Sequence, residues 1–329
     1  MPPRLHPRSD MAVCRLAAAV LLAALTVACA PVPSPDEDVP VVAEDRPSLP
    51  PQRKAKVANG PSATSQLLTQ YYARVERSLL AKGLLRTDGG GRDTPFDAAT
   101  LADTFIRVAL FDEYSEVGGQ LVAKQTASRL HRWTVPVNVT LDFGPSVAPE
   151  VVARDTALVR AYVARLARAT GHQMQLSDGP GNFNVFIVNE DERRALAPRL
   201  RDLIPGLSDA ALRLVTDLPQ SNYCIAYALD GTDSGSYSRA IAIVRAEHPD
   251  LLRLSCLHEE IAQGLGLSND SPLARPSIFN DDEEFALLTP MDEMMLKMLY
   301  DSRLRPGMTA AEAAPIAQGI ALELLGGDV

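Results

Sequence analysis

Residues 258–271 read His-Glu-Glu-Ile-Ala-Gln-Gly-Leu-Gly-Leu-Ser-Asn-Asp-Ser, and this stretch decides the fold. Two side chains four residues apart lie on the same face of a helix, so Glu259 and Gln263 are expected to face one site, with Glu260 beside them. Gly266 permits a turn out of the helix that brings Asn269 back towards that site. The spacing therefore predicts a helix and a glycine turn that direct polar side chains to one point.

This spacing resembles the H-E-x-x-H-x-x-G-x-x-H motif of the metzincin zinc peptidases, whose histidines bind the metal and whose glutamate is the general base. The resemblance places Glu259, Gln263 and Asn269 at the three ligand positions and Glu260 at the base position, with Asp270 directly after the third. None of the ligand positions holds a histidine. The motif is therefore that of a zinc peptidase whose ligands have been replaced.

The neighbouring His258 suggests a second register, because His258-Glu259 also begins an H-E pair. The residue four positions on is Ala262, which cannot bind a metal. Gln263 lies five positions on, about 140° around the helix from His258, so the two do not face one site well. The register that starts at Glu259 is the one that agrees with Gly266.

Two later segments resemble the metzincins in the same order. Pro276-Ser277-Ile278-Phe279-Asn280 resembles the Met-turn, with Phe279 in place of the methionine. Leu288-Thr289-Pro290-Met291-Asp292 resembles the start of the C-terminal metzincin helix, with Thr289 as N-cap and Pro290 in the first turn. The resemblance implies a zincin-like fold. The acidic run 281–284 between these segments indicates a solvated loop.

A wider resemblance covers about residues 95–305. It is carried by Arg132-Trp133 and Pro136-Val137, and by Glu259-Glu260, Gln263, Leu265-Gly266-Leu267 and Asn269-Asp270-Ser271. On these residues the chain is similar to the domain-of-unknown-function family 2927, a family of proteobacterial lipoproteins. The resemblance implies the fold of that family and the location of a lipoprotein, and it leaves the function open.

The rest of the domain mixes helical and strand patterns without a strict βαβ rhythm, which predicts an α+β fold with a mixed twisted sheet and long helices. Strands are expected at residues 133–143, 173–176, 183–188, 223–229 and 237–244, and helices at 65–85, 99–110, 149–170, 191–203, 208–218 and 249–265.

The N-terminal region predicts export and anchoring. Residues 1–28 have the basic and apolar parts of a signal peptide, and residues 26–29, Thr-Val-Ala-Cys, resemble a lipobox with Cys29 as the lipid-attachment residue. The alternative is an ordinary signal peptide cut near Ala30. A proline-rich tether is expected at 29–63, an N-terminal helix and glycine-rich linker at 64–94, and the metzincin-like domain at 95–329. These features predict a periplasm-facing protein of the cell envelope, held at the outer membrane by its lipid anchor.

The net charge limits the kinds of partner, and the cysteine content bears on disulfide formation. The formal net charge of −9, with no basic face, excludes nucleic acid as a partner. Cys224 and Cys256 remain in the folded part, and the sequence leaves open whether they form a disulfide or stay as two buried thiols.

Three interpretations of the motif follow. In the first, the domain is not catalytic, holds no metal, and binds an envelope protein or peptide in the cleft between sheet edge and motif helix, because amides such as Gln263 and Asn269 are poor zinc ligands. In the second, it is an active hydrolase with Glu260 as general base and a non-standard metal set, Zn²⁺ or Ca²⁺, or with paired carboxylates and no metal. In the third, Glu259 and Gln263 belong to a structural polar network.

Overall fold

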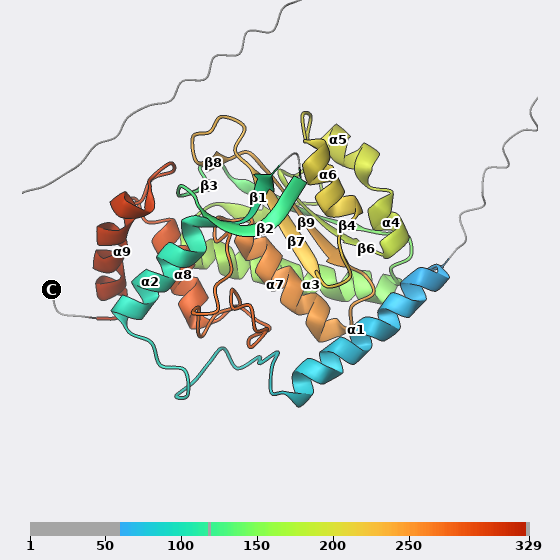
Figure 1. Cartoon of the computed structure of the whole chain (residues 1–329), viewed down its shortest axis with the longest axis horizontal. Coiled ribbons are helices and arrows are strands. Elements are labelled where there is room, and N and C mark those ends of the chain that lie inside the picture. Colours follow the sequence, from blue (N-terminus) through green and yellow to red (C-terminus); the bar gives the residue numbers. More distant parts are fainter. Residues whose placement is uncertain (1–59, 118–119, 327–329) are drawn as a thin grey trace, which may run out of the picture. The chain divides into compact units, whose positions relative to one another are not determined.

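The computed structural model describes residues 60–117 and 120–326, which fall in one compact unit (Figure 1). The signal peptide, Cys29 and nearly all of the tether lie outside the described residues. Within the described ranges, no helix combines the length and the apolar character needed to span a membrane.

A five-stranded mixed sheet lies at the centre of the described residues, with strand order β5-β4-β6-β9-β7. Its strands are β4 (Val137–Phe143), β5 (Met174–Leu176), β6 (Phe183–Val188), β7 (Cys224–Leu229) and β9 (Arg239–Arg245). Neighbours are parallel except β7, which pairs antiparallel with β9 at one edge. A mixed sheet with helices confirms the predicted α+β class.

Helices cover both faces of this sheet. On one face lie α2 (Ala98–Ala109), α3 (Pro149–Thr170), α7 (Asp250–Gln263), α8 (Pro290–Leu299) and α9 (Ala310–Leu324), which share the main core. On the other face α5 (Ala197–Leu203) and α6 (Asp209–Thr216) pack on a second core that includes Ile243. Because β6 and β9 are buried on both faces, their sequences are almost continuously apolar.

Some elements differ from the predicted ones. The helix expected at 191–203 is two helices, α4 (Glu190–Arg194) and α5, because Pro198 lacks the N–H that a continuous helix needs there. A hairpin of β1 (Phe111–Val117) and β2 (Gln120–Ala127) was not predicted. The single strand expected at 133–143 is divided into β4 and the two-residue β3 (Arg132–Trp133), which pairs with β8 (Ser236–Tyr237).

The N-terminal helix α1 (Ala63–Ala81), which was expected to precede the domain, packs on it within one compact unit. Tyr72 is fully buried, and its hydroxyl donates to the Gln220 carbonyl at 2.9 Å. The Ser65 hydroxyl donates to Glu247 at 2.7 Å. The glycine run that suggested a linker therefore connects two parts of one compact unit.

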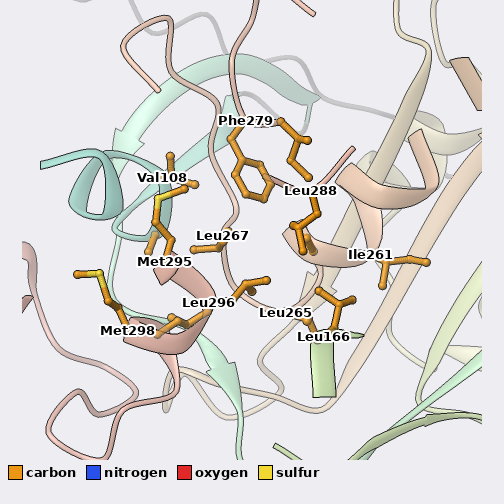
Figure 2. Packing of buried hydrophobic residues seen from close by; sticks show 14 of the residues in the cluster. Val108, Leu166, Ile261, Leu265, Leu267, Phe279, Leu288, Met295, Leu296 and Met298 are labelled. Carbon is orange, nitrogen blue, oxygen red and sulfur yellow. The ribbon is translucent and has the colours of Figure 1, made fainter. Parts of the chain in front are cut away.

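The segment resembling a Met-turn lies in the core beside α8. Phe279 is fully buried, and Figure 2 shows its ring among the apolar side chains of the main core, near Leu288. Asp292, also fully buried, accepts hydrogen bonds from the Ser277 hydroxyl at 2.6 Å and the Ile278 N–H at 3.2 Å. The Asp292 carboxylate also completes the capping box at Thr289, so one side chain joins the turn to the start of α8.

A disulfide joins Cys224 at the start of β7 to Cys256 in α7, with their Cα atoms 5.8 Å apart. It closes a loop between residues separated by 32 positions in the sequence. The bond fixes the edge strand of the sheet to the helix that carries the motif.

We expect reduction of this disulfide to destabilise the domain. Closing a loop of this length contributes roughly 3 to 4 kcal/mol through the entropy of the unfolded chain. For a domain of this size that corresponds to a fall in melting temperature of about 5–10 °C, measured by calorimetry with and without reductant. The double variant Cys224→Ala/Cys256→Ala is the control, since its melting temperature should be the same with and without reductant. If the wild-type melting temperature also stayed the same on adding reductant, the result would contradict the expectation.

Candidate functional site

A cavity of about 580 Å³ opens beside the C-terminal half of α7. The described residues lining it include seven acidic side chains, and we call this cavity the acidic pocket. These side chains are Glu113, Glu259, Glu260, Asp270, Asp281, Asp282 and Glu283. Lys82, at the end of α1, is the one basic residue among the described lining residues. The pocket therefore concentrates negative charge at the end of the motif helix.

Two consecutive glutamates of α7 line the acidic pocket. Glu260 is only 4% exposed, and its Oε2 atom makes no hydrogen bond within the described residues. Glu259 is half-buried. One oxygen of each carboxylate and the Cys224 sulfur lie within 4.8 Å of one another. Because that sulfur belongs to the disulfide, only the two carboxylates are available as ligands in this group.

The expected convergence of Glu259, Gln263 and Asn269 needs correction at its third member. The Asn269 side-chain amide donates to the Arg107 carbonyl at 2.9 Å, and its backbone N–H donates to the Val108 carbonyl at 3.1 Å. Asn269 therefore caps the last turn of α2, whose carbonyls lack partners within the helix, and it does not line the acidic pocket. Asp270 lines it instead.

Gln263 and Asp270 are joined within the acidic pocket. The Gln263 amide nitrogen donates to the Asp270 carboxylate at 3.1 Å. This hydrogen bond holds the residue after the glycine turn against the motif helix. The two segments that the motif was predicted to bring together do meet, with Asp270 in the place expected for Asn269.

The glycine turn is set by close packing. Gly266 has a φ of +124°, and a Cβ there would lie 2.1 Å from the His131 carbonyl oxygen. Only glycine fits such a position. Beside it, the Trp133 indole N–H donates to the Gly264 carbonyl at 2.8 Å. Trp133, one of the residues that carried the family resemblance, thus holds the end of the motif helix.

His258 lies outside the acidic pocket. Its ring stacks on Tyr162 with centroids 3.9 Å apart, and its Nδ1 accepts a hydrogen bond from the Leu288 N–H at 3.0 Å. Burial lowers the pKa of His258 to about 3, so the imidazole is neutral. The histidine is a structural residue between α3, α7 and the segment before α8.

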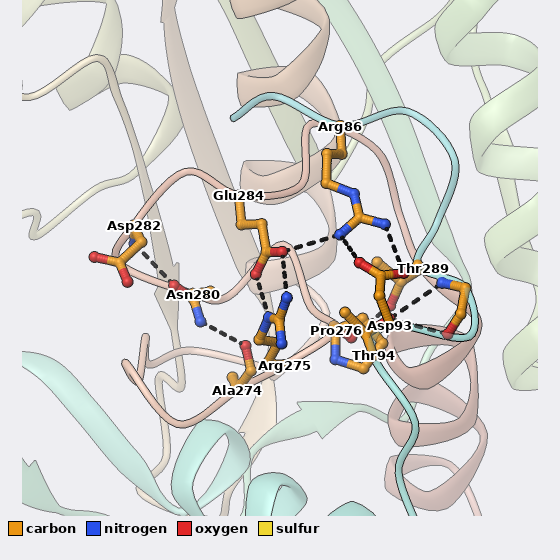
Figure 3. Close-up of polar contacts among 12 residues, drawn as sticks. Arg86, Asp93, Thr94, Ala274, Arg275, Pro276, Asn280, Asp282, Glu284 and Thr289 are labelled. Carbon is orange, nitrogen blue, oxygen red and sulfur yellow. Dashed lines mark hydrogen bonds and ion pairs between the residues drawn. The ribbon is translucent and has the colours of Figure 1, made fainter. Parts of the chain in front are cut away.

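Residues 281–283 lie at the mouth of the acidic pocket, and Asp281 and Asp282 are exposed, in agreement with the solvated loop predicted there. Figure 3 shows the Glu284 carboxylate between Arg86 and Arg275, which donate to it at 3.1 Å and 2.5–2.9 Å. The Asn280 amide donates to the Ala274 carbonyl at 2.8 Å, and the Asp282 N–H donates to Asn280. These contacts fix both ends of the acidic run.

Crowding of carboxylates changes their acidity. Burial, followed by the charges of neighbouring carboxylates, raises the pKa of Glu259, Glu260 and Asp270 well above their ordinary values. Burial raises the pKa of Glu283 to about 7. In the absence of a cation, the acidic pocket therefore retains protons that exposed carboxylates lose near pH 4.

The donor set does not fit the zinc ion that the motif resemblance implies. Catalytic zinc is held by three protein ligands, mostly imidazoles or thiolates. The described lining residues provide carboxylates and amides, with His258 outside the pocket and Cys224 in a disulfide. Oxygen donors of this kind suit hard cations.

A second cavity of about 340 Å³ continues from the acidic pocket along the edge of the sheet. The two cavities share Glu113 and Gln263 as lining residues. The second is lined on one side by Ala226–Ala228 of β7 and on the other by the start of β1, and it reaches Asp230. We call this cavity the β7 groove.

The fold and the pocket define an α+β domain with a carboxylate-lined site at the C-terminal end of α7. The chain belongs to the family described as "Protein of unknown function (DUF2927)", which matches residues 98–319. Neither a curated protein nor a solved structure matches it.

Sequence reasoning missed Glu113 and Glu283 as members of the site. Glu283 follows the turn at Phe279 by four residues, so the acidic run was a usable signal once that turn was aligned. Glu113 lies in the unpredicted β1–β2 hairpin, far from the motif in sequence, and no local pattern indicates it.

We expect Glu260→Gln to stabilise the domain in cation-free buffer more at pH 8 than at pH 5. A folded-state pKa above the unfolded value means that folding takes up protons, so the stability present below about pH 4.5 is lost as the pH rises towards the raised pKa. At pH 5 protonation of Glu260 costs little and glutamine resembles the neutral acid. At pH 8 the buried carboxyl must be either kept protonated or ionised at a cost, and glutamine removes that cost. Melting temperatures at the two pH values measure this difference.

The matched control is Asp103→Asn, at an exposed position on α2. This variant should shift the melting temperature equally at both pH values. A Glu260→Gln variant that is less stable than wild type at pH 8 would contradict the raised pKa.

Proposed function

We propose that this protein is a lipid-anchored protein of the cell envelope whose zincin-like domain has no peptidase activity and binds an extended peptide segment in the β7 groove. The observation that carries the proposal is the composition of the site. At the positions where the motif would hold zinc, the pocket presents carboxylates and an amide, while the nearby imidazole, His258, is packed on Tyr162.

The order of elements around the site supports the zincin-like scaffold. The motif helix α7 ends in the Gly266 turn, and the turn at Phe279 is tied to the start of α8 by Asp292. The antiparallel edge strand β7 lies beside α7 and is bonded to it by the disulfide. These pieces stand in the order that the metzincin resemblance implies.

The state of Glu260 supports the absence of peptidase chemistry. A general base must be deprotonated to accept a proton from water, and its best pKa lies near the working pH. The pKa of Glu260 is raised well above its ordinary value by burial and by neighbouring carboxylates, which favours the neutral acid. The alternative, a hydrolase with Glu260 as base, would require this carboxylate to be ionised and free to accept a proton, and not occupied as a ligand of a cation.

The geometry of β7 supports binding of an extended segment. Within the described part of the sheet, β7 pairs with β9 on one side only. An edge strand can accept the backbone of a partner as an added strand. Ala226 and Ala228 lie on the α7 side of the strand, where they line the groove with short side chains. An envelope protein or peptide with an extended segment is therefore the partner that we propose.

We expect the mature protein to contain no stoichiometric zinc and to cleave no peptide in a broad library, but to select extended peptides from that library. Mass spectrometry of protein purified without chelator measures the metal. Ala226→Trp fills the groove at a half-buried position and should weaken binding of a selected peptide at least tenfold, measured by fluorescence anisotropy.

The matched control is Ala157→Trp, at an exposed position on α3 away from the groove. This variant should bind the selected peptide as the wild type does. Stoichiometric zinc, or peptide cleavage abolished by Glu260→Gln, would overturn the non-catalytic part of the proposal. If wild type and Ala226→Trp bound the peptide equally, the β7 groove would not be the peptide-binding site.

The anchoring part of the proposal rests on the lipobox-like residues before Cys29, with Ala30 after it favouring the outer membrane. We expect Cys29→Ala to release the protein from the membrane fraction, because acyl chains and no transmembrane helix would hold it there. Fractionation and mass spectrometry of the N-terminal peptide test this. Cys14→Ala, within the signal peptide, is the control; release by both variants, or an unmodified Cys29, would rule out the anchor.

A further inference from the structure

We propose that the acidic pocket is a binding site for one hard divalent cation of the Ca²⁺ class, held by the carboxylates of Glu259 and Glu260, with Asp270 lining the same pocket. This site goes beyond the peptide-binding function proposed above, although the acidic pocket and the β7 groove share Glu113 and Gln263. It assigns a cation to a pocket whose side chains lack the histidines of the zinc motif.

The spacing of the two α7 carboxylates fits such an ion. Ca²⁺ binds oxygen ligands at 2.3–2.6 Å, so two oxygens on opposite sides of one ion are about 5 Å apart. Oxygens of Glu259 and Glu260 lie within 4.8 Å of each other. One ion can therefore contact both carboxylates without movement of the helix.

A buried oxygen without a partner points to the same ligand. Glu260 lines the acidic pocket, is 4% exposed, and its Oε2 has no hydrogen-bond partner among the described residues. A buried carboxylate oxygen normally accepts hydrogen bonds or coordinates a metal. No described residue donates a hydrogen bond to Oε2, and the charged groups that act on Glu260 are other carboxylates.

The remaining lining residues can complete the coordination. Gln263 holds the Asp270 carboxylate against α7 through its amide nitrogen. Glu113 and Glu283 supply further oxygens from β1 and from the fixed acidic run. Ca²⁺ takes six to eight oxygen ligands in flexible geometry, whereas Mg²⁺ needs a small octahedral site. A pocket of about 580 Å³ with ligands from four separate chain segments suits the larger ion.

The electrostatics of the pocket also favour a cation. Seven acidic side chains line the pocket against one ammonium group, that of exposed Lys82, in the described residues. Burial makes the ionised carboxylates costly without a counter-charge. A bound divalent ion provides that charge and permits several of them to ionise together.

Titration of chelator-treated mature protein by calorimetry tests this site. We expect one Ca²⁺ ion per chain, tighter than Mg²⁺ by at least tenfold, and a rise in melting temperature on adding Ca²⁺. Terbium gives a second measurement, because Tyr223 lines the pocket and should sensitise the emission of a bound Tb³⁺ ion. Added Ca²⁺ should then quench this emission by displacement.

The variant Glu259→Gln/Glu260→Gln should bind Ca²⁺ at least tenfold more weakly and should melt no lower than the wild type without cation, because it removes repelled charges. Asp103→Asn on α2 should bind as the wild type does. Absence of both Ca²⁺ heat and terbium emission would overturn the site. It would also be overturned by zinc binding tighter than Ca²⁺, or by an arginine-rich peptide that fills the pocket in chelator and is not displaced by Ca²⁺.

Discussion

The buried carboxylate of Asp292 is the contact on which the site depends. It accepts hydrogen bonds from Ser277, from the backbone of Ile278 and from the Thr289 cap, so it joins the Phe279 turn to α8. That turn in turn holds the residue after Asp270, because the Ser271 N–H donates to the Phe279 carbonyl at 2.9 Å. This connection adds to the Gln263 hydrogen bond that holds Asp270 against α7 and to the contacts of Arg86 and Arg275 that hold Glu284. An interior polar group with all its partners specifies one arrangement of the segments around it.

The acidic pocket, in contrast, destabilises the fold. Its carboxylates repel one another and lose hydration, and both effects raise their pKa values. The fold withstands this through contacts outside the pocket: the disulfide from β7 to α7, and the pairs of Glu284 with Arg86 and Arg275. Unfavourable charge that a structure maintains is typical of a site kept for a ligand.

Local patterns predicted much of this structure. The α3 bounds of 149–170 and the β6 bounds of 183–188 agree with the prediction, as does Thr289 as N-cap, because propensity, capping residues and apolar periodicity act over a few neighbours. The exchange of Asn269 for Asp270 could not be predicted, since the carbonyls that bind Asn269 belong to α2, about 160 residues earlier in the chain. Glu113 reaches the pocket through a hairpin whose packing is equally non-local.

The acidic pocket has one wall that does not come from the region shared with the family. The family match begins at residue 98, whereas Leu79, Lys82 and Leu84 line the pocket from α1 and the segment after it. A relative that keeps the shared region but differs before it would present similar carboxylates behind a different rim. Selectivity among ligands can therefore diverge in the N-terminal segment while the acidic floor stays unchanged, and a protein trimmed to the shared boundaries would expose that floor to solvent.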